Sequence, residues 1–173
     1  IVACHSDQAL KILRNADDLE RQVLGAIPYR PNRVVLHRDA SLMPKRKRAW
    51  SAWNYLRSAK DNAEPEVSVT YWMNRLQGIA DDKPLFITLN PPHEPKPGTV
   101  FGEWSYEHPQ FDATAIKAQA VLPQLQGRNG VWFAGAWTGF GFHEDGLRSG
   151  LEAAQALGAQ LPFAVHGSTI RRA

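Results

Sequence analysis

The apolar and polar positions of the first 30 residues predict one short strand and two short helices. Ile1 to Cys4 are all apolar, which is typical of a buried strand. Ser6-Asp7 can cap a helix over Gln8–Leu13, and Asp17-Asp18-Leu19-Glu20 resembles a capping box at the start of a second helix. Gly25 is placed to end that second helix.

From Arg33 the pattern changes to short β-rich runs separated by polar or proline-rich loops. In one run, Val67, Val69 and Tyr71 alternate with polar residues, as they do in a half-buried strand. Successive runs of this kind predict an antiparallel sheet. The runs are Val34–Leu36, Trp50–Leu56, Val67–Trp72, Leu85–Leu89 and Val100–Tyr106.

The segment Asn90–Gly98 contains Pro91, Pro92, Pro95 and Pro97. Proline lacks a backbone donor and has a fixed φ angle, so this segment is neither a helix nor a central strand. We expect it to be a long hairpin connection.

A helical period begins at Asp112, with Ala115, Ala118, Leu122 and Leu125 on one face. Pro123 shortens or kinks this helix, and Gly127 stops it.

The last pattern is a strand, a glycine-rich loop and a helix. Val131–Ala134 is a continuous apolar run, as expected of a strand in a parallel sheet that is covered on both faces. The loop Gly135–Phe142 then leads into a helix that ends at Gly158 and whose apolar stripe is Leu147, Leu151, Ala154 and Leu157. The remaining residues, 159–173, are expected to form a loosely structured tail.

Composition indicates an ordinary globular chain of one domain, or of one domain and part of another. It has 173 residues, 43% of them hydrophobic, and a formal net charge of +3. This weak positive balance, with no basic stripe among stacking aromatics, argues against a nucleic-acid partner. The single Cys4 favours a reducing compartment, and we expect a cytoplasmic protein.

The sequence has no apolar run long enough for a transmembrane segment, and its start lacks the features of a signal peptide. The chain begins inside an apolar run without an initiating methionine, so we expect it to be an internal or C-terminal part of a longer protein.

Several short motifs do not support the chemistry that they suggest. His37-Arg38-Asp39 is similar to a kinase catalytic loop, but Pro44 occupies the position of the metal-binding asparagine. His143-Glu144 begins like a zinc-protease helix, but Leu147 replaces the second histidine. We therefore predict no metal site. The basic run Lys45–Arg48 is interpreted as a solvated turn, with a phosphate or acidic-lipid site as the alternative.

The segment Val131–Ala154 is the best candidate for a ligand site. A buried strand that passes through small residues to a helix N-terminus leaves backbone N–H groups unpaired and lets a ligand approach the main chain. Such a site suits an electron-rich ligand. The alternative is a glycine-rich turn that only packs, and the loop does not match G-x-G-x-x-G because Glu144 stands at the third glycine position.

This segment resembles the C-terminal flavin-binding segment of the amine-oxidase and phytoene-desaturase superfamily of FAD-dependent oxidoreductases. The residues that carry the resemblance are Phe133-Ala134-Gly135, Gly141 and Glu144–Ala154. Further stretches, such as Ala3–Leu10, Trp50–Tyr55 and Thr88–Pro92, are similar to a bacterial subgroup of predicted NAD/FAD-binding, amine-oxidase-like proteins.

The resemblance implies FAD as the cofactor in the intact parent protein. Gly135 and Ala136 would lie near the pyrophosphate and ribityl chain, and the amides of Gly146 and Leu147 would point at the pyrimidine edge of the flavin. Many relatives have an acidic residue where this chain has Ala136, so a ribityl contact is not expected there. The cofactor-binding residues that we predict are Gly135, Ala136, Trp137, Gly141, Phe142, His143, Glu144, Asp145, Gly146 and Leu147.

The resemblance also implies a division into domains. Residues 1–7 and 128–158 would form part of an FAD-binding, Rossmann-like domain without its N-terminal G-x-G-x-x-G unit, and residues 8–127 the substrate domain. The expected fold class is α+β, with α/β character at the ends: an antiparallel substrate-domain sheet with helices.

The resemblance implies that the parent protein oxidises a C–N or C–C bond of a small-molecule substrate. An apolar substrate is one interpretation. The six tryptophans could line an apolar cavity, although a place in the sheet core is the alternative for each. The sequence identifies no catalytic base.

Two other functions stay open: a non-catalytic, truncated module that binds a lipid or hydrocarbon, and a nucleotide-dependent transferase that uses the glycine-rich turn for phosphate. Because half of the FAD domain would be missing, we also expect the chain to self-associate.

Overall fold

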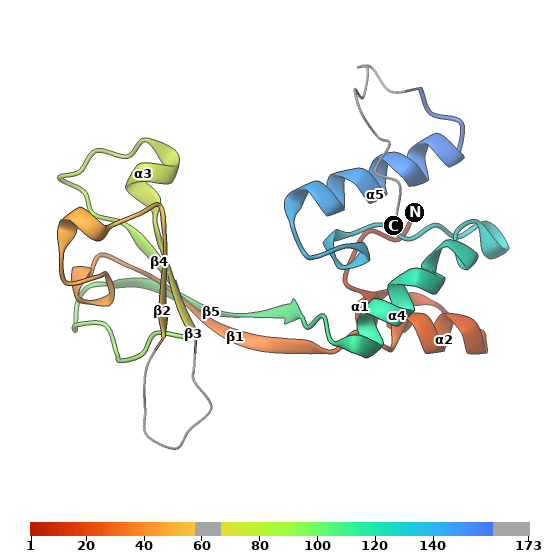
Figure 1. Cartoon of the computed structure of the whole chain (residues 1–173), viewed down its shortest axis with the longest axis horizontal. Helices are drawn as coiled ribbons and strands as arrows, with labels where there is room; N and C mark the ends of the chain where they lie inside the picture. The colour runs from red at the N-terminus through yellow and green to blue at the C-terminus, as the bar shows by residue number, and fades with distance from the viewer. Residues whose placement is uncertain (58–66, 161–173) are drawn as a thin grey trace. The chain divides into compact units, whose positions relative to one another are not determined.

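The computed structural model describes residues 1–57 and 67–160, and these form two compact units. The helical unit consists of Ile1–Tyr29 and the segment from Pro109 onward, and the sheet unit consists of Arg30–His108 (Figure 1). In the described part of the chain, no helix has the length and apolar character that a membrane span requires. The mixed α+β class that we predicted is confirmed.

The helical unit begins with two short helices, as predicted. They are α1 (Ser6–Ile12) and α2 (Asp18–Leu24). The capping box is confirmed, because Asp17 Oδ1 accepts from the amide of Glu20 at 2.8 Å and Glu20 Oε2 accepts from the amide of Asp17 at 2.8 Å. Gly25 follows the last residue of α2.

The helix α4 (Ala113–Val121) contributes Ala115 and Ala118 to the core of this unit. Asp112 caps it, and it gives way to the 3₁₀ turn Leu122–Gln124, which contains Pro123, as predicted. Its apolar face packs against α2 in a buried cluster. The cluster includes Val23, Leu24, Ile27, Ala115, Ala118, Leu122 and Leu125.

The two predicted strands of a parallel sheet meet at a single parallel bridge between Val2 and Phe133. The amide of Val2 donates to the carbonyl of Trp132 at 2.7 Å, and the amide of Ala134 donates to the carbonyl of Val2 at 3.0 Å. The parallel direction agrees with the prediction, but one bridge is not a Rossmann-like sheet, which stays a prediction.

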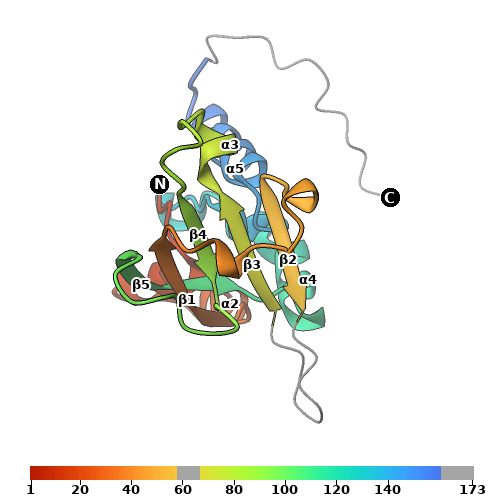
Figure 2. The same cartoon turned by 90° about the vertical axis from the view of Figure 1, so that its left-hand side faces the viewer.

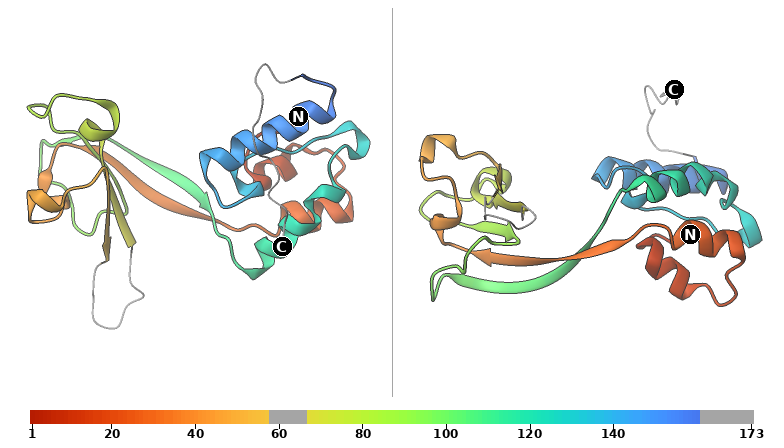
Figure 3. Two further views of the ribbon diagram at one scale, coloured as in Figure 1. Left: turned by 45° about the horizontal axis from the view of Figure 1, so that its top comes forward. Right: turned by 60° about the horizontal axis from the view of Figure 1, so that its bottom comes forward.

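The sheet unit is built on five strands in the order β2-β3-β4-β1-β5, with antiparallel pairing as predicted. Figure 2 shows β2, β3, β4 and β1 side by side, and Figure 3 shows β1 beside β5. The strands are β1 (Tyr29–His37), β2 (Trp53–Arg57), β3 (Val67–Trp72), β4 (Phe86–Leu89) and β5 (Val100–Pro109). The unit also contains α3 (Met73–Gln77) and the 3₁₀ turns Ala40–Leu42 and Lys47–Ala49.

The segment Asn90–Gly98 is not the hairpin connection that we expected, because β1 lies between β4 and β5. The segment is held against β1 instead. The amide of Arg33 donates to Asn90 Oδ1 at 3.1 Å, and the Arg33 guanidinium forms a two-bond ion pair with Glu94 at 2.6 and 2.8 Å. The segment therefore crosses β1 between the end of β4 and the start of the edge strand β5.

One face of the sheet carries two rows of apolar side chains, which we call the open face. The register places Val34, Leu89, Val69 and Tyr55 in one row and Leu36, Ile87, Tyr71 and Trp53 in the next. Of these eight side chains only that of Val34 is fully buried.

The opposite face is the buried one, and it is largely polar. Its central row is Val35, Thr88, Thr70 and Asn54, all buried. Thr70 Oγ1 donates to the carbonyl of Leu42 at 3.2 Å, so the segment around residue 42 covers this face. The predicted alternation in β3 is therefore present, but its polar positions are the ones that the fold buries.

The structure divides the chain at other positions than those predicted from the resemblance. Residues 8–29 and 109–127 belong to the helical unit, because α1, α2 and α4 share its core. The assignment of cofactor and substrate roles to parts of the chain stays a prediction. Residues 161–173 of the expected tail lie outside the described residues.

Candidate functional site

The loop after Phe133 requires glycine at two positions. Gly135 has φ 150° and Gly141 has φ 88°, both in the region that disfavours side chains. A Cβ atom at Gly135 would lie 2.8 Å from the ring of Trp137. That ring is buried, and its Nε1 donates to the carbonyl of Cys4 at 2.9 Å. The loop therefore follows one defined path over the end of the Val2–Phe133 bridge.

Three polar side chains from neighbouring helical segments hold this path. Ser149 Oγ accepts from the amide of Gly135 at 2.9 Å. Gln119 Nε2 donates to the carbonyls of Trp137 and Gly139, at 2.8 and 2.6 Å. Gln126 bonds both the amide and the carbonyl of Phe133, each at 2.8 Å.

We did not predict these two glutamines. A signal was available for Gln119, which lies four residues after the buried Ala115 and so on the same side of α4. A polar residue on a buried helical face indicates a specific internal acceptor.

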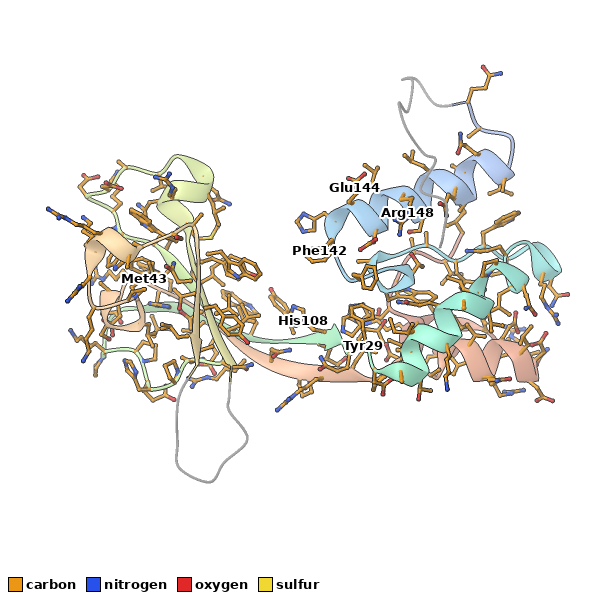
Figure 4. All side chains as sticks on the ribbon, in the orientation of Figure 1. Tyr29, Met43, His108, Phe142, Glu144 and Arg148 are labelled. Carbon is orange, nitrogen blue, oxygen red and sulfur yellow. The ribbon has the colours of Figure 1, made fainter. Side chains whose placement is uncertain are left out.

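The glycine-rich loop ends at the helix α5 (His143–Ala156), and an ion pair fixes its start. Asp145 is buried, and its Oδ2 accepts from the amides of Phe140 and Phe142 at 2.9 and 3.1 Å. Arg148 donates to Asp145 Oδ1 at 2.8 Å. Figure 4 shows Arg148 one turn beyond Glu144. The pair leaves the start of α5 without a net side-chain charge from Asp145.

Two backbone amides at the start of α5 have no acceptor. The amides of Asp145 and Gly146 donate to the carbonyl of Phe142, at 3.1 and 3.3 Å. Among the described residues, those of His143 and Glu144 donate to none. Phe142, His143 and Glu144 are exposed residues, so the start of α5 lies at the surface of the helical unit.

The ten predicted cofactor-binding residues are thus brought together only in part. Gly135, Ala136 and Gly146 meet, because a Cβ atom at Gly146 would lie 3.6 Å from the amide nitrogen of Ala136. Trp137 points into the core, and Asp145 is committed to the loop, so neither side chain is available to a cofactor.

The structure also changes which amides can act as donors. The Gly146 amide is bonded within the first turn of the helix, so the available donors are those of His143 and Glu144. The predicted apolar stripe of α5 is only partly covered: Leu147 and Leu157 are exposed by 53% and 58%, whereas Leu151 and Ala154 are half-buried. The face that packs on the loop consists of Asp145, Ser149 and Ala153.

A cavity of about 120 Å³ lies beside the loop, but none of the ten predicted residues lines it. It is smaller than the range of about 300–1,000 Å³ that is usual for cofactor sites. Its lining residues are Gln119, Leu122, Pro123, Gln126, Thr138, Arg148, Ser149 and Glu152.

The aspartate of the motif His37-Arg38-Asp39 has a structural role. Asp39 is buried and accepts bonds from the amides of Ser41 and Lys96, at 2.9 and 2.8 Å. Burial alone would raise the pKa of this carboxyl, but these hydrogen bonds outweigh it and the pKa is lowered. The basic side chains of residues 45–48 are exposed. In the described part of the chain, no three His, Cys, Asp or Glu side chains cluster closely enough for a metal ion.

No protein-family model matches the chain, and no match is found among curated proteins.

Proposed function

We propose that this chain is part of an FAD-dependent, amine-oxidase-like oxidoreductase, and that the start of α5 contacts the flavin. The observation that carries the proposal is the pair of unbonded amides of His143 and Glu144, at the surface-exposed start of a helix of 14 residues. They lie within the stretch that resembles the flavin-binding segment of that superfamily.

The residues present fit the flavin end of FAD. The pyrimidine edge of a flavin has acceptor atoms, to which the two amides can donate, and the helix dipole favours the negative charge of the reduced ring. Gly146 presents no side chain to the backbone of Ala136, where a Cβ atom would lie 3.6 Å from the amide nitrogen, so the start of α5 packs closely on the loop. The neutralised Asp145–Arg148 pair does not oppose that charge.

When bound, the flavin accepts a hydride equivalent from a C–N or C–C bond of the substrate and later passes the electrons to O2 or another acceptor. The chain's own contribution is to position the ring and to donate hydrogen bonds to it. The sequence contains no G-x-G-x-x-G unit for the pyrophosphate and adenosine of FAD, and Ala136 has no carboxylate for the ribityl chain. We therefore expect the dissociation constant of FAD to be weaker than about 1 µM, or about −8 kcal/mol.

The His143 amide can be removed with little change to the helix. His143 is the first residue of α5, a position that accepts proline, and Phe142 before it has the extended backbone that proline requires (φ −88°, ψ 159°). His143→Pro deletes the N–H, whereas the matched His143→Ala keeps it. Riboflavin and FAD are titrated against both variants, and the quenching of flavin fluorescence is followed.

We expect His143→Ala to bind like the native chain and His143→Pro to bind about 3- to 10-fold more weakly, as for the loss of one hydrogen bond. Riboflavin should bind almost as well as FAD, since the predicted contacts are to the ring. Equal binding by the two variants would refute the role of this amide. Competition by ADP as strong as that by riboflavin would favour the nucleotide-dependent transferase instead.

A further inference from the structure

We propose that the open face of the sheet unit binds an uncharged, mainly hydrocarbon small molecule that carries a neutral hydrogen-bonding group. The exposure of its aromatic side chains is the first observation. Trp53, Tyr55, Trp104 and Tyr106 are exposed by 59, 62, 47 and 53%. Large apolar side chains that gather on an exposed face mark a binding surface when they form a contiguous patch.

The second observation is that this face is concave. A groove of about 320 Å³ crosses β1, β3, β4 and β5, and its volume falls in the range of about 300–1,000 Å³ that is usual for small-molecule sites. The lining residues are Val34, Leu36, Tyr71, Ile87, Leu89, Trp104, Tyr106 and His108.

The chemistry of the lining selects the ligand. None of the eight residues is Asp, Glu, Lys or Arg, so a charged ligand would lose its hydration without an ionic partner. The polar groups of the lining are two tyrosine hydroxyls and the imidazole of His108 (Figure 4). His108 Nδ1 lies 3.0 Å from Asn32 Nδ2, which fixes the ring at the β5 side of the groove. The two tyrosine hydroxyls of the lining suit a neutral hydroxyl or carbonyl group of the ligand.

A glycine shapes one wall of the groove. The ring of Trp104 lies over Gly102, so that a Cβ atom at Gly102 would overlap it. Gly102 does not have a positive φ angle, so the space for the ring is a direct reason for glycine there. The identity of residue 102 therefore controls the position of a side chain that lines the site.

The proposal that this groove binds a ligand depends on residues of the sheet unit alone. The further step, that this ligand is the substrate of the oxidoreductase, rests on the proposed function.

The test uses the whole chain and 1-decanol as the probe, with tryptophan emission and calorimetry as readouts. We expect decanol to bind, and decanoate and decylammonium to bind at least tenfold more weakly. Equal binding of the charged homologues, or no binding of decanol, would overturn the proposal.

Two variants locate the site. Ile87→Asp places a charge in the groove, and the matched Phe101→Asp places it on an exposed side chain that belongs to β5 but does not line the groove. We expect the first to weaken decanol binding at least tenfold and the second to leave it unchanged. If Ile87→Asp does not fold, Gly102→Ala decides the question, because displacement of the Trp104 ring should weaken binding several-fold.

Unchanged binding in Gly102→Ala and in a folded Ile87→Asp would refute the site. A dimer in sedimentation that Ile87→Asp dissociates would instead identify a second copy of the chain as the occupant. Decanol binding without any riboflavin binding would refute the flavin proposal and leave this one intact, so the two failures are distinguishable.

Discussion

His37 donates a hydrogen bond from Nε2 to the hydroxyl oxygen of Thr88, over 2.7 Å, on the buried face of the sheet. The direction follows from the neighbours, because the amide of Asp39 donates to His37 Nδ1 at 3.1 Å and leaves the proton of the neutral ring on Nε2. Thr70 uses its own proton on the carbonyl of Leu42, so Thr88 donates to Thr70, at 2.8 Å. The chain of bonds runs in one direction and requires neutral His37.

This arrangement predicts that the protein loses stability in mild acid. Burial lowers the pKa of the His37 imidazole below its usual 6.5, although attraction from Asp39 opposes the shift. As the pH falls below about 6.5, the unfolded chain binds a proton that the folded chain does not. The free energy of unfolding should therefore decrease with falling pH, by up to about 1.4 kcal/mol per pH unit from this group.

The check compares thermal midpoints between pH 7.5 and 5.5 in His37→Gln and in the control His143→Gln, which changes an exposed histidine. His37→Gln should be less stable at pH 7.5 by about 1–3 kcal/mol, because the Asp39 amide loses its acceptor. It should also respond less to acid, whereas the control keeps the native response. The same acid response in all three proteins would contradict the assignment.

Two glycines of the candidate site should respond oppositely to alanine. Gly135→Ala forces a side chain into a disfavoured φ and against the Trp137 ring, and should destabilise the protein by about 1–3 kcal/mol. Gly146→Ala adds a methyl group in ordinary contact inside α5 and should leave the protein as stable or stabilise it by up to about 1 kcal/mol. Chemical denaturation measures both, and similar losses would show that the loop path differs from the one described.

Gly146→Val should separate folding from flavin binding. Gly146 has helical rather than positive φ, so valine should cost less than about 1 kcal/mol of stability. Its γ-methyl groups would press on the loop backbone at Ala136 and shift the start of α5, whose free amides we propose as donors to the flavin. Fluorescence titration with riboflavin should show several-fold weaker binding in a protein with a nearly native thermal midpoint, and native affinity would refute the role of these amides.

The exposed leucines of the apolar stripe of α5, Leu147 and Leu157, predict self-association. Leu147→Glu places a charge on this stripe, whereas Gln155→Glu places the same charge on an exposed polar position of the same helix. Light scattering over a range of concentrations should show association of the native chain and of Gln155→Glu, and less of it in Leu147→Glu. A native chain that is monomeric throughout would contradict the prediction.

Local features of the fold could be predicted from the sequence because neighbouring residues determine them. The capping box at Asp17 and the end of α4 before Pro123 depend on residues within one helical turn. The exposed face of the sheet could not be predicted, since the alternation in β3 identifies two faces and not which one the segment around Leu42 covers. The prediction that Asn90–Gly98 is a hairpin connection was wrong for a similar reason. Its proline content excludes regular structure but does not specify which strand the segment leads to.

The loop and the helix of the candidate site could be predicted from the sequence, but not which backbone amides are free to donate hydrogen bonds. Glycine-rich strand-loop-helix patterns indicate free amides somewhere in the first turn. Which amides remain free depends on the carbonyl of Phe142, which is already an acceptor for Asp145 and Gly146. The contacts of Gln119 with the loop join residues that are 18 and 20 positions apart, beyond the reach of a local pattern.

The bridge between Val2 and Phe133 also bears on the order of folding. Its partners lie on either side of the whole sheet unit in the sequence, so the helical unit cannot be completed until residues beyond Phe133 have been synthesised. The pairs β2–β3 and β3–β4 join nearer residues and are available earlier. Contacts between distant residues form slowly. During synthesis, the sheet unit should therefore fold before α1 and α2 can pack against Phe133 and Trp137.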